Sequence, residues 1–180
     1  ATQNPIEQEG TYPLPEAQRD RFMFHVDVRY PDREQEHAIL ERTTGTYQAD
    51  LRPVMSAPEV IECQRIIRGV PVPEHVSVYV LDLVRCCRPR EADALASVKD
   101  LIEWGPGPRA GQMLLLGGKV RALLKGRYHV TSDDIEALAG PVLRHRIVPT
   151  FNAEAEGIGA NEIVRRVLED TPRPAPISIV

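Results

Sequence analysis

Long apolar runs and an excess of positive charge are both absent from this sequence of 180 residues. No run approaches the roughly 18–20 apolar residues that a membrane-spanning helix needs. The N-terminus has neither the charged region nor the apolar region of a signal peptide. The formal net charge is -4, with acidic and basic residues mixed along the chain, which argues against a bulk electrostatic grip on nucleic acid. We therefore expect a protein that binds neither membranes nor nucleic acids.

Cysteine is also scarce, with three residues in the chain, of which Cys86 and Cys87 are adjacent. They give neither an even disulfide framework nor the ligand spacing of a metal site. Neighbouring side chains on a helix point about 100° apart, so we interpret the pair as half-buried helix packing rather than a redox site. We expect reduced thiols, no metal site and a cytoplasmic location.

Several short motifs that carry common chemistries are missing as well. The sequence contains no Gly-x-x-x-x-Gly-Lys-Ser/Thr phosphate-binding loop, no Gly-x-Gly-x-x-Gly after a strand, no His-Glu-x-x-His and no Gly-x-Ser-x-Gly. Glu7 and Glu9 lie in a loop flanked by proline and glycine, where solvated charge is the simplest interpretation. His129 and His145 are interpreted as structural or surface residues. Residue patterns alone therefore predict a helical interaction module.

What is present indicates a folded protein with little β-structure. Hydrophobic residues make up 42% of the chain and charged residues 27%, as in ordinary globular proteins. Prolines and glycine break up the first residues, and Pro15-Glu16-Ala17-Gln18 then predicts a short helix. Residues 22–30 alternate apolar and polar side chains, which predicts a half-buried strand. It is the only convincing strand in the first 150 residues, so its sheet partners must come from missing sequence, the tail or another chain.

From Pro31 onward the apolar period becomes helical. Capping boxes at residues 32–35 and 56–59 and a cap at 131–134 open three helices, and Gly140-Pro141 should break or kink the third. A further helix is expected after residues 70–73, with Val76, Val80, Leu83 and Val84 on its buried face, and others near residues 109–124 and 160–170. We expect no sheet between residues 31 and 150. Gly117-Gly118 in the 109–124 helix predicts close contact with a neighbouring helix. The side chains expected to be mostly buried are Val76, Val80, Leu83, Met113, Leu116, Val120, Ile135 and Leu138.

The predicted fold class is mainly α and divides into three parts. Residues 1–30 are interpreted as the remnant of an α/β domain, with one helix and one strand. Residues 31–150 are interpreted as a helical bundle, and residues 151–180 as an extension whose last residues, 177–180, can pair as a strand.

One long stretch of the chain points to a family. Residues 1–18 read ATQNPIEQEGTYPLPEAQ and run into Asp20-Arg21-Phe22, which closely resembles a signature of the MoxR branch of AAA+ ATPases. The downstream matches are Pro108-Arg109-Ala110, Gly126-Arg127, Val130-Thr131, Asp133-Asp134 and Val142-Leu143-Arg144-His145-Arg146. The family usually has Gly-Ala-Ser-Pro-Arg-Ala where this chain has Gly105-Pro106-Gly107-Pro108-Arg109-Ala110, a departure that can alter the approach of the lid helix.

The resemblance implies roles for three residues. Asn4 matches the first sensor, which helps to orient the attacking water, and Arg21 matches the arginine finger, which reaches a neighbouring subunit's nucleotide. Arg109 matches the second sensor, on a helical lid that closes over the phosphates, and is therefore the residue expected to bind the nucleotide. Such positioning and charge are what phosphoryl transfer requires.

The resemblance also implies a function for a longer protein. It would be an ATPase that uses ATP and Mg²⁺, forms a homo-oligomeric ring of six subunits, and remodels other proteins in a chaperone-like way, often with von Willebrand A-type partners. This chain would be its C-terminal part, with the helical lid. Because the phosphate-binding loop is not in the sequence, we expect the isolated chain to bind no ATP and to be inactive.

Two alternatives remain open at the level of sequence. The first is a non-enzymatic helical protein-interaction module in which the sensor residues are relics. The second is a helix-turn-helix DNA binder, whose recognition helix would carry Arg109, Lys119, Arg121 and Lys125.

Overall fold

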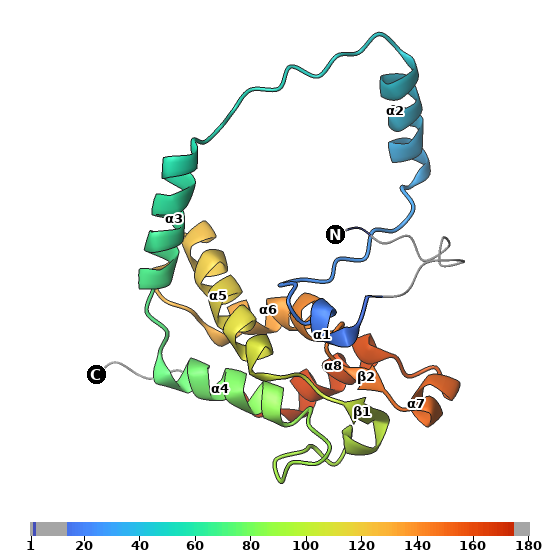
Figure 1. Cartoon of the computed structure of the whole chain (residues 1–180), viewed down its shortest axis with the longest axis vertical. Helices are drawn as coiled ribbons and strands as arrows, with labels where there is room; N and C mark the ends of the chain where they lie inside the picture. The colour runs from blue at the N-terminus through green and yellow to red at the C-terminus, as the bar shows by residue number, and fades with distance from the viewer. Residues whose placement is uncertain (1, 3–13, 175–180) are drawn as a thin grey trace. The chain divides into compact units, whose positions relative to one another are not determined.

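The structure, a computed structural model, describes residue 2 and residues 14–174. The elements in this range, in chain order, are α1 (Glu16–Arg19), α2 (Arg33–Thr44), α3 (Ala57–Gly69), α4 (Glu74–Arg85), the 3-10 turn η2 (Lys99–Leu101), β1 (Ile102–Trp104), α5 (Pro108–Leu124), α6 (Ser132–Leu143), β2 (Val148–Pro149), α7 (Phe151–Ala155) and α8 (Ala160–Asp170) (Figure 1). The fold is mainly α, which confirms the predicted class. None of the helices in the described ranges is long and apolar enough to cross a membrane.

The chain divides into two compact units. One combines residues 1–25 with residues 67–180, and the other is formed by residues 26–66. The first unit therefore joins the short N-terminal helix α1 to the helices that follow α3, although a long stretch of chain separates them.

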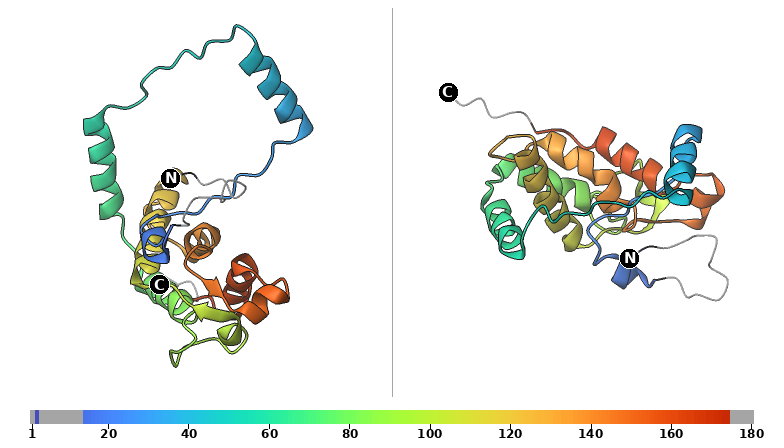
Figure 2. Two further views of the ribbon diagram at one scale, coloured as in Figure 1. Left: turned by 45° about the vertical axis from the view of Figure 1, so that its right-hand side comes forward. Right: turned by 90° about the horizontal axis from the view of Figure 1, so that it is seen from above.

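The core of the first unit lies between α4, α5, α6 and α8, which the views of Figures 1 and 2 show packed together. Its largest fully buried apolar side chains are Tyr79, Leu83, Leu114, Ile135, Leu143, Ile163, Val76, Val98, Val130, Val142 and Val167. Burying a large apolar side chain contributes about 1.5–3 kcal/mol, so this set supplies the main stabilisation of the unit.

The buried face of α4 follows the expected stripe, but that of α5 does not. In α4 the buried residues include Val76, Val80 and Leu83, as predicted. In α5 they are Ala110, Leu114, Gly117, Gly118 and Ala122, whereas Met113, Leu116 and Val120 are only half-buried. The buried face of α5 consists mostly of small residues. The face predicted from its large apolar side chains is therefore rotated about the helix axis relative to the observed one.

The two glycines in the middle of α5 explain this rotation. A Cβ atom on Gly118 would lie 2.9 Å from Val130 Cγ1 and 3.1 Å from Ile135 Cδ1, and one on Gly117 would lie 2.8 Å from Leu138 Cδ1. Because Ile135 and Leu138 belong to α6, the absent side chains let α5 and α6 approach closely. This confirms the contact predicted from the glycine pair.

Asp134 anchors the start of α6 as part of a capping box with Thr131. Its carboxylate is fully buried and accepts hydrogen bonds from Arg127 Nη1 at 2.7 Å, from Arg121 Nη1 at 3.0 Å and from the Thr131 backbone N–H at 3.0 Å. Of the predicted break or kink at Gly140-Pro141, the break does not occur, since the helix continues through Pro141 to Leu143.

A short ladder appears where no sheet was predicted. Strands β1 and β2 pair antiparallel, with Ile102 opposite Pro149 and Trp104 opposite Val148. The expectation of a purely helical region between residues 31 and 150 is therefore wrong at β1 and β2. Strands this short show no alternation that a sequence pattern could reveal.

The strand predicted over residues 22–30 is also not formed within the described residues. The segment is extended, but its backbone joins a helix instead of a sheet, since the His25 N–H donates to the Pro141 carbonyl oxygen of α6 at 2.8 Å. Alternation of apolar and polar residues indicates which side of an extended chain is apolar, not whether a partner strand exists. Residues 177–180, the other predicted strand, lie outside the described residues.

The second unit contains α2 and most of α3, whose starts were predicted correctly. Asp32 and Gln35 form the reciprocal capping box of α2, at 2.9 and 3.2 Å, and Ser56 and Glu59 bond to each other at the start of α3. Neither helix has a fully buried residue.

Both neighbouring thiols lie inside the first unit. Cys86 and Cys87 are buried, and each Sγ donates to the Leu83 carbonyl oxygen, at 3.3 and 3.2 Å. The pair is free of disulfide, as expected, but buried more completely than the half-burial predicted.

Candidate functional site

The turn after α1 carries Arg21, the first residue of the site. The Asp20 N–H donates to the Glu16 carbonyl at 2.9 Å, and the Arg21 and Phe22 N–H groups donate to Gln18 and Arg19 at 3.1 Å. These bonds wind the chain tightly through residue 22 and direct the side chains of Asp20 and Arg21 to different surroundings.

Asp20 connects this turn to two arginines that are distant in the sequence. Its Oδ2 atom accepts from Arg109 Nη1 at 2.7 Å, and its Oδ1 atom accepts from Arg146 Nε at 2.8 Å. One carboxylate therefore bridges the start of α5 and the residues just past the end of α6.

Arg146 binds the backbone of the turn as well as the side chain of Asp20. Its guanidinium, which is 1% exposed, donates to the carbonyl oxygens of Asp20 at 2.7 Å and Phe22 at 2.6 Å. It also bonds the carbonyls of Met23 at 3.4 Å and Val142 at 2.5 Å. Burial lowers the pKa of Arg146, and the hydrogen bond and charge of Asp20 act in the opposite direction. The carbonyls on both sides of Arg21 are thus held by one buried cation.

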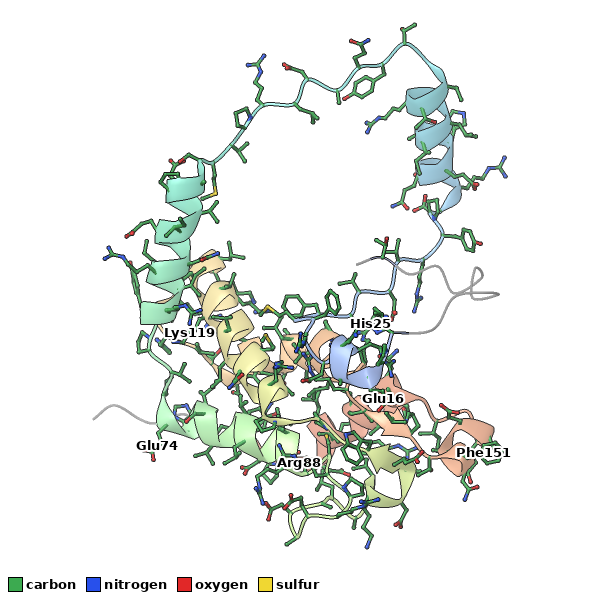
Figure 3. All side chains as sticks on the ribbon, in the orientation of Figure 1. Glu16, His25, Glu74, Arg88, Lys119 and Phe151 are labelled. Atoms are coloured by element: carbon green, nitrogen blue, oxygen red, sulfur yellow. The ribbon has the colours of Figure 1, made fainter. Side chains whose placement is uncertain are left out.

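His145 provides a second hold on the same turn. Its Nε2 atom lies 3.1 Å from the Phe22 carbonyl oxygen, which can only accept, so Nε2 carries the proton. Burial, with the neighbouring charge of Arg146, lowers the pKa of His145 to about 4. The ring meets that of His25 edge-on, with centroids 6.0 Å apart. Figure 3 labels Glu16 on α1 and, just beyond the turn, His25, whose N–H donates to the Pro141 carbonyl oxygen of α6.

Arg21 itself points to solvent. Its side chain is exposed and has no hydrogen bond or ion pair with any residue in the described ranges. Because the backbone around Arg21 is held in place and its guanidinium is exposed, the side chain is positioned to contact a molecule outside the unit.

Arg109 lies in the first turn of α5, a position suited to an anion. Pro108 occupies the first helical position, Gly107 is the N-cap, and the first turn has no acidic residue. The backbone N–H groups at a helix N-terminus favour negative charge. The Arg109 side chain is 41% exposed, and its ion pair within the described residues is with Asp20.

A shallow cavity of about 300 Å³ lies next to this helix start. It is lined by Arg88, Pro89, Arg90, Glu91, Glu103, Trp104, Gly105, Pro106 and Gly107. Arg88, labelled in Figure 3, holds one wall by donating from Nε to the Pro106 carbonyl oxygen at 3.0 Å. Gly105 allows the close approach of this wall to the end of α4, since a Cβ there would lie 2.1 Å from the Cys87 carbonyl oxygen.

The structure does not bring the predicted site residues together. Arg109 binds the Asp20 carboxylate, whereas Arg21 is only the next residue in the chain and its side chain points to solvent. Asn4 lies outside the described residues. Asp20 and Arg146 were not among the predicted site residues, although both stand in the stretches Asp20-Arg21-Phe22 and 142–146 that carry the family resemblance. Within residues 14–174, no group of three or more His, Cys, Asp or Glu side chains is arranged to hold a metal ion.

Comparison with known proteins shows which family the chain resembles. Residues 95–167 match the family model of the AAA lid domain, and residues 1–24 match that of the ATPase family associated with various cellular activities. The chain is 37% identical over 174 residues to Chaperone MoxR1 of Mycobacterium tuberculosis, covering 97% of this chain and 46% of that protein. It is 34% identical over 181 residues to the uncharacterized protein YeaC of Bacillus subtilis, covering 100% of this chain and 54% of YeaC.

A solved structure shows the same fold. The crystal structure of a candidate ATPase from Cytophaga hutchinsonii superimposes with a TM-score of 0.88 at 34% identity, covering 96% of this chain and 53% of that chain. This chain spans about half the length of the curated relatives it matches. From the two family models, these relatives and the shared fold, the chain belongs to the MoxR-type family of AAA+ ATPases, with the lid domain of that family at residues 95–167.

Proposed function

We propose that this chain supplies the arginine finger and the helical lid of an ATPase that couples ATP hydrolysis to chaperone-like remodelling of partner proteins. The family membership supports the ATPase part, and the name of Chaperone MoxR1 supports the chaperone part. In this proposal residues 1–30 end the ATPase core and residues 31–150 contain most of the lid. The match to the lid family model at residues 95–167 runs into the proposed extension of residues 151–180. The full-length protein would work in the cytoplasm as a ring of six subunits, with von Willebrand A-type proteins among its partners.

The exposed Arg21 on its anchored turn is the observation that carries this proposal. Hydrolysis of ATP depends on placing positive charge against the transferred phosphoryl group, and a finger supplied from a neighbouring subunit makes hydrolysis depend on assembly. Such a finger must be free at its tip and rigid at its base. Arg21 has both properties, because its guanidinium is exposed while Arg146 and His145 hold the carbonyls beside it.

The described residues fit the phosphate end of a nucleotide at Arg109. There the exposed guanidinium lies at the N-terminus of α5, where the helix dipole adds positive charge. Bound ATP would supply the phosphoryl group that is transferred, with Mg²⁺ neutralising its charge. No ligand for Mg²⁺ is assigned to residues 14–174, because no suitable group of side chains exists there. Asn4 is proposed to orient the attacking water.

The proposed roles separate two variants of the full-length protein. Arg21→Ala should lower turnover by about 10³- to 10⁵-fold with little change in nucleotide affinity, because the finger acts on a neighbour. Arg109→Ala should weaken both binding and turnover, because the lid contacts its own nucleotide. Steady-state ATPase rates and binding titrations check this. Arg165→Ala is the control, because Arg165 is an exposed residue of α8 whose ion pairs within residues 14–174 are with Glu162 and Glu169. Equal binding defects in the two variants would refute the separation of roles.

A non-enzymatic interaction module is the second candidate, and one observation favours it. Residues 26–66 contain many large apolar side chains that are exposed, among them Val28, Tyr30, Tyr47, Leu51, Val54 and Ile61. Exposed apolar clusters are typical of surfaces that bind other proteins. A full-length protein that binds partners but shows no ATP turnover would support this candidate against the ATPase.

A further inference from the structure

The two arginines on Asp20 differ sharply in how firmly they are held. The Arg146 side chain is 1% exposed and donates to four backbone carbonyl oxygens in addition to its Nε bond to the Asp20 carboxylate. The Arg109 side chain is 41% exposed and, within the described residues, bonds to Asp20 alone. Exposed ion pairs contribute little to stability, while a buried guanidinium loses heavily when it loses its acceptors. Arg109 can therefore leave Asp20 while Arg146 stays.

The Arg109 guanidinium has one anionic partner in the described range, and a bound phosphate would be a second. Arginine binds both carboxylates and phosphates through the same planar set of N–H donors, so the two anions are rivals for it. Asp20 is also joined through the peptide bond to Arg21, and its own carbonyl oxygen is a ligand of Arg146. If Arg109 leaves Asp20, the carboxylate that loses this cation lies one residue before Arg21, the proposed finger.

We infer that Asp20 is a positioning residue that competes with bound nucleotide for Arg109, and so links a subunit's own nucleotide to the turn that carries Arg21. The inference rests on the proposed role of Arg109 in nucleotide binding. Without nucleotide, Arg109 ties the start of α5 to the Arg21 turn. With nucleotide, Arg109 turns to the phosphates, and Arg146 alone holds Asp20.

Binding of a non-hydrolysable ATP analogue to the full-length protein tests the competition. Asp20→Asn keeps the size of the side chain but removes the charge that attracts Arg109, so the Kd of the analogue should fall by about 2- to 5-fold. The same substitution made together with Arg109→Gln should leave the Kd at the value of Arg109→Gln alone. The matched control is Glu16→Gln, which removes a negative charge from the same short helix, where Glu16 pairs with Arg19 at 3.6 Å. This control should not tighten binding.

These variants distinguish a competitor from a merely structural residue. If Asp20 only supports the fold, Asp20→Asn weakens analogue binding or leaves it unchanged, and the inference is overturned. Tightening that persists in the Arg109→Gln background would also overturn it, because that result reflects general electrostatics. If the unmodified full-length protein does not bind the analogue at all, the proposed function fails before the inference is reached.

Carboxyl footprinting of the unmodified full-length protein gives a second test that requires no substitution at Asp20. Carbodiimide-activated labelling, read by mass spectrometry, reports how accessible each carboxylate is. Saturating analogue should raise labelling of Asp20 by about 2-fold or more, since Arg109 no longer covers it, while Glu16 in the same peptide serves as the internal reference. Labelling of Asp20 that stays constant or falls relative to Glu16 would show that Arg109 does not leave it.

Discussion

Asp134 is a carboxylate that is wholly buried and still charged. Burial alone would raise its pKa, but hydrogen bonds from Arg127 and Thr131 outweigh burial and lower the pKa to about 2. Its role is structural: it closes the capping box of α6 and ties that helix to the end of α5 through Arg121 and Arg127.

Asp134→Asn should therefore destabilise the chain by about 3 kcal/mol, because removing one partner of a buried ion pair leaves the other charge uncompensated. Asp133→Asn is the matched control at the neighbouring position, where the side chain is 73% exposed and pairs with Arg173 at 3.5 Å. That change should cost less than about 1 kcal/mol. Urea unfolding monitored by circular dichroism measures both, and similar losses in the two variants would contradict the structural role of Asp134.

His145 makes stability depend on pH. Its pKa is about 4 in the folded chain and 6.5 in an unfolded one, so between these values the unfolded chain binds more protons at this position. Stability contributed by neutral His145 is therefore present above about pH 6.5 and is lost as the pH falls towards 4.

The urea midpoint of the unmodified chain should accordingly fall between pH 6.5 and 4 more steeply than that of His145→Gln, which keeps a donor for the Phe22 carbonyl oxygen but cannot be protonated. Exposed His129 is the control, and His129→Gln should follow the unmodified chain. Parallel curves for the unmodified chain and His145→Gln would show that His145 does not control the transition.

At the scale of elements, the contact between α5 and α6 depends on a missing side chain. Overpacking a well-packed core costs about 1–3 kcal/mol, which outweighs the ~1 kcal/mol that alanine gains over glycine in a helix. Gly118→Ala should therefore destabilise the chain by up to about 2 kcal/mol, since both neighbours of the new methyl group, Val130 and Ile135, are fully buried.

Gly111→Ala in the same helix should have the opposite sign. A Cβ there would lie 3.5 Å from Val80 Cγ1, which is ordinary contact, so about 1 kcal/mol of helix propensity should appear as added stability. Thermal unfolding of the two variants compares them directly. Stabilisation by Gly118→Ala would mean that α5 and α6 are not in close contact.

The elements that the sequence predicted best are those governed by neighbours in the chain. The capping boxes at Asp32, Ser56 and Thr131 act over three residues, so the starts of α2, α3 and α6 could be read directly. The buried face of α5 could not be predicted from the sequence. Its glycine and alanine residues are buried because α6 packs closely against them, which no pattern within α5 reveals. The pairing of Asp20 with Arg109 spans 89 residues, and only the fold brings the two together.

At the scale of the whole molecule, the lid domain and the turn that carries Arg21 are present, but a phosphate-binding loop is not in this sequence. The isolated chain should bind ATP weakly or not at all and should show no turnover, because the loop supplies most contacts to the phosphates. Isothermal titration and a phosphate-release assay measure this, with the full-length protein as the positive control. Turnover by the purified chain, free of contaminating ATPases, would contradict the expectation.

The hydrogen bond from the His25 N–H to the Pro141 carbonyl oxygen also has a consequence for chain connectivity. It fastens the chain to α6 just before residues 26–66 leave the first unit, and the bond from Lys119 Nζ to the Arg68 carbonyl oxygen, at 2.9 Å, fastens it again just after they return. Between the two bonds, the stretch of residues 45–56 that joins α2 to α3 has no helix or strand. The entropy of closing a flexible segment between fixed points grows only logarithmically, by about 0.6 kcal/mol for each doubling of its length. This stretch can therefore lengthen or shorten at small thermodynamic cost, while the register in which Asp20 meets Arg109 and Arg146 stays unchanged.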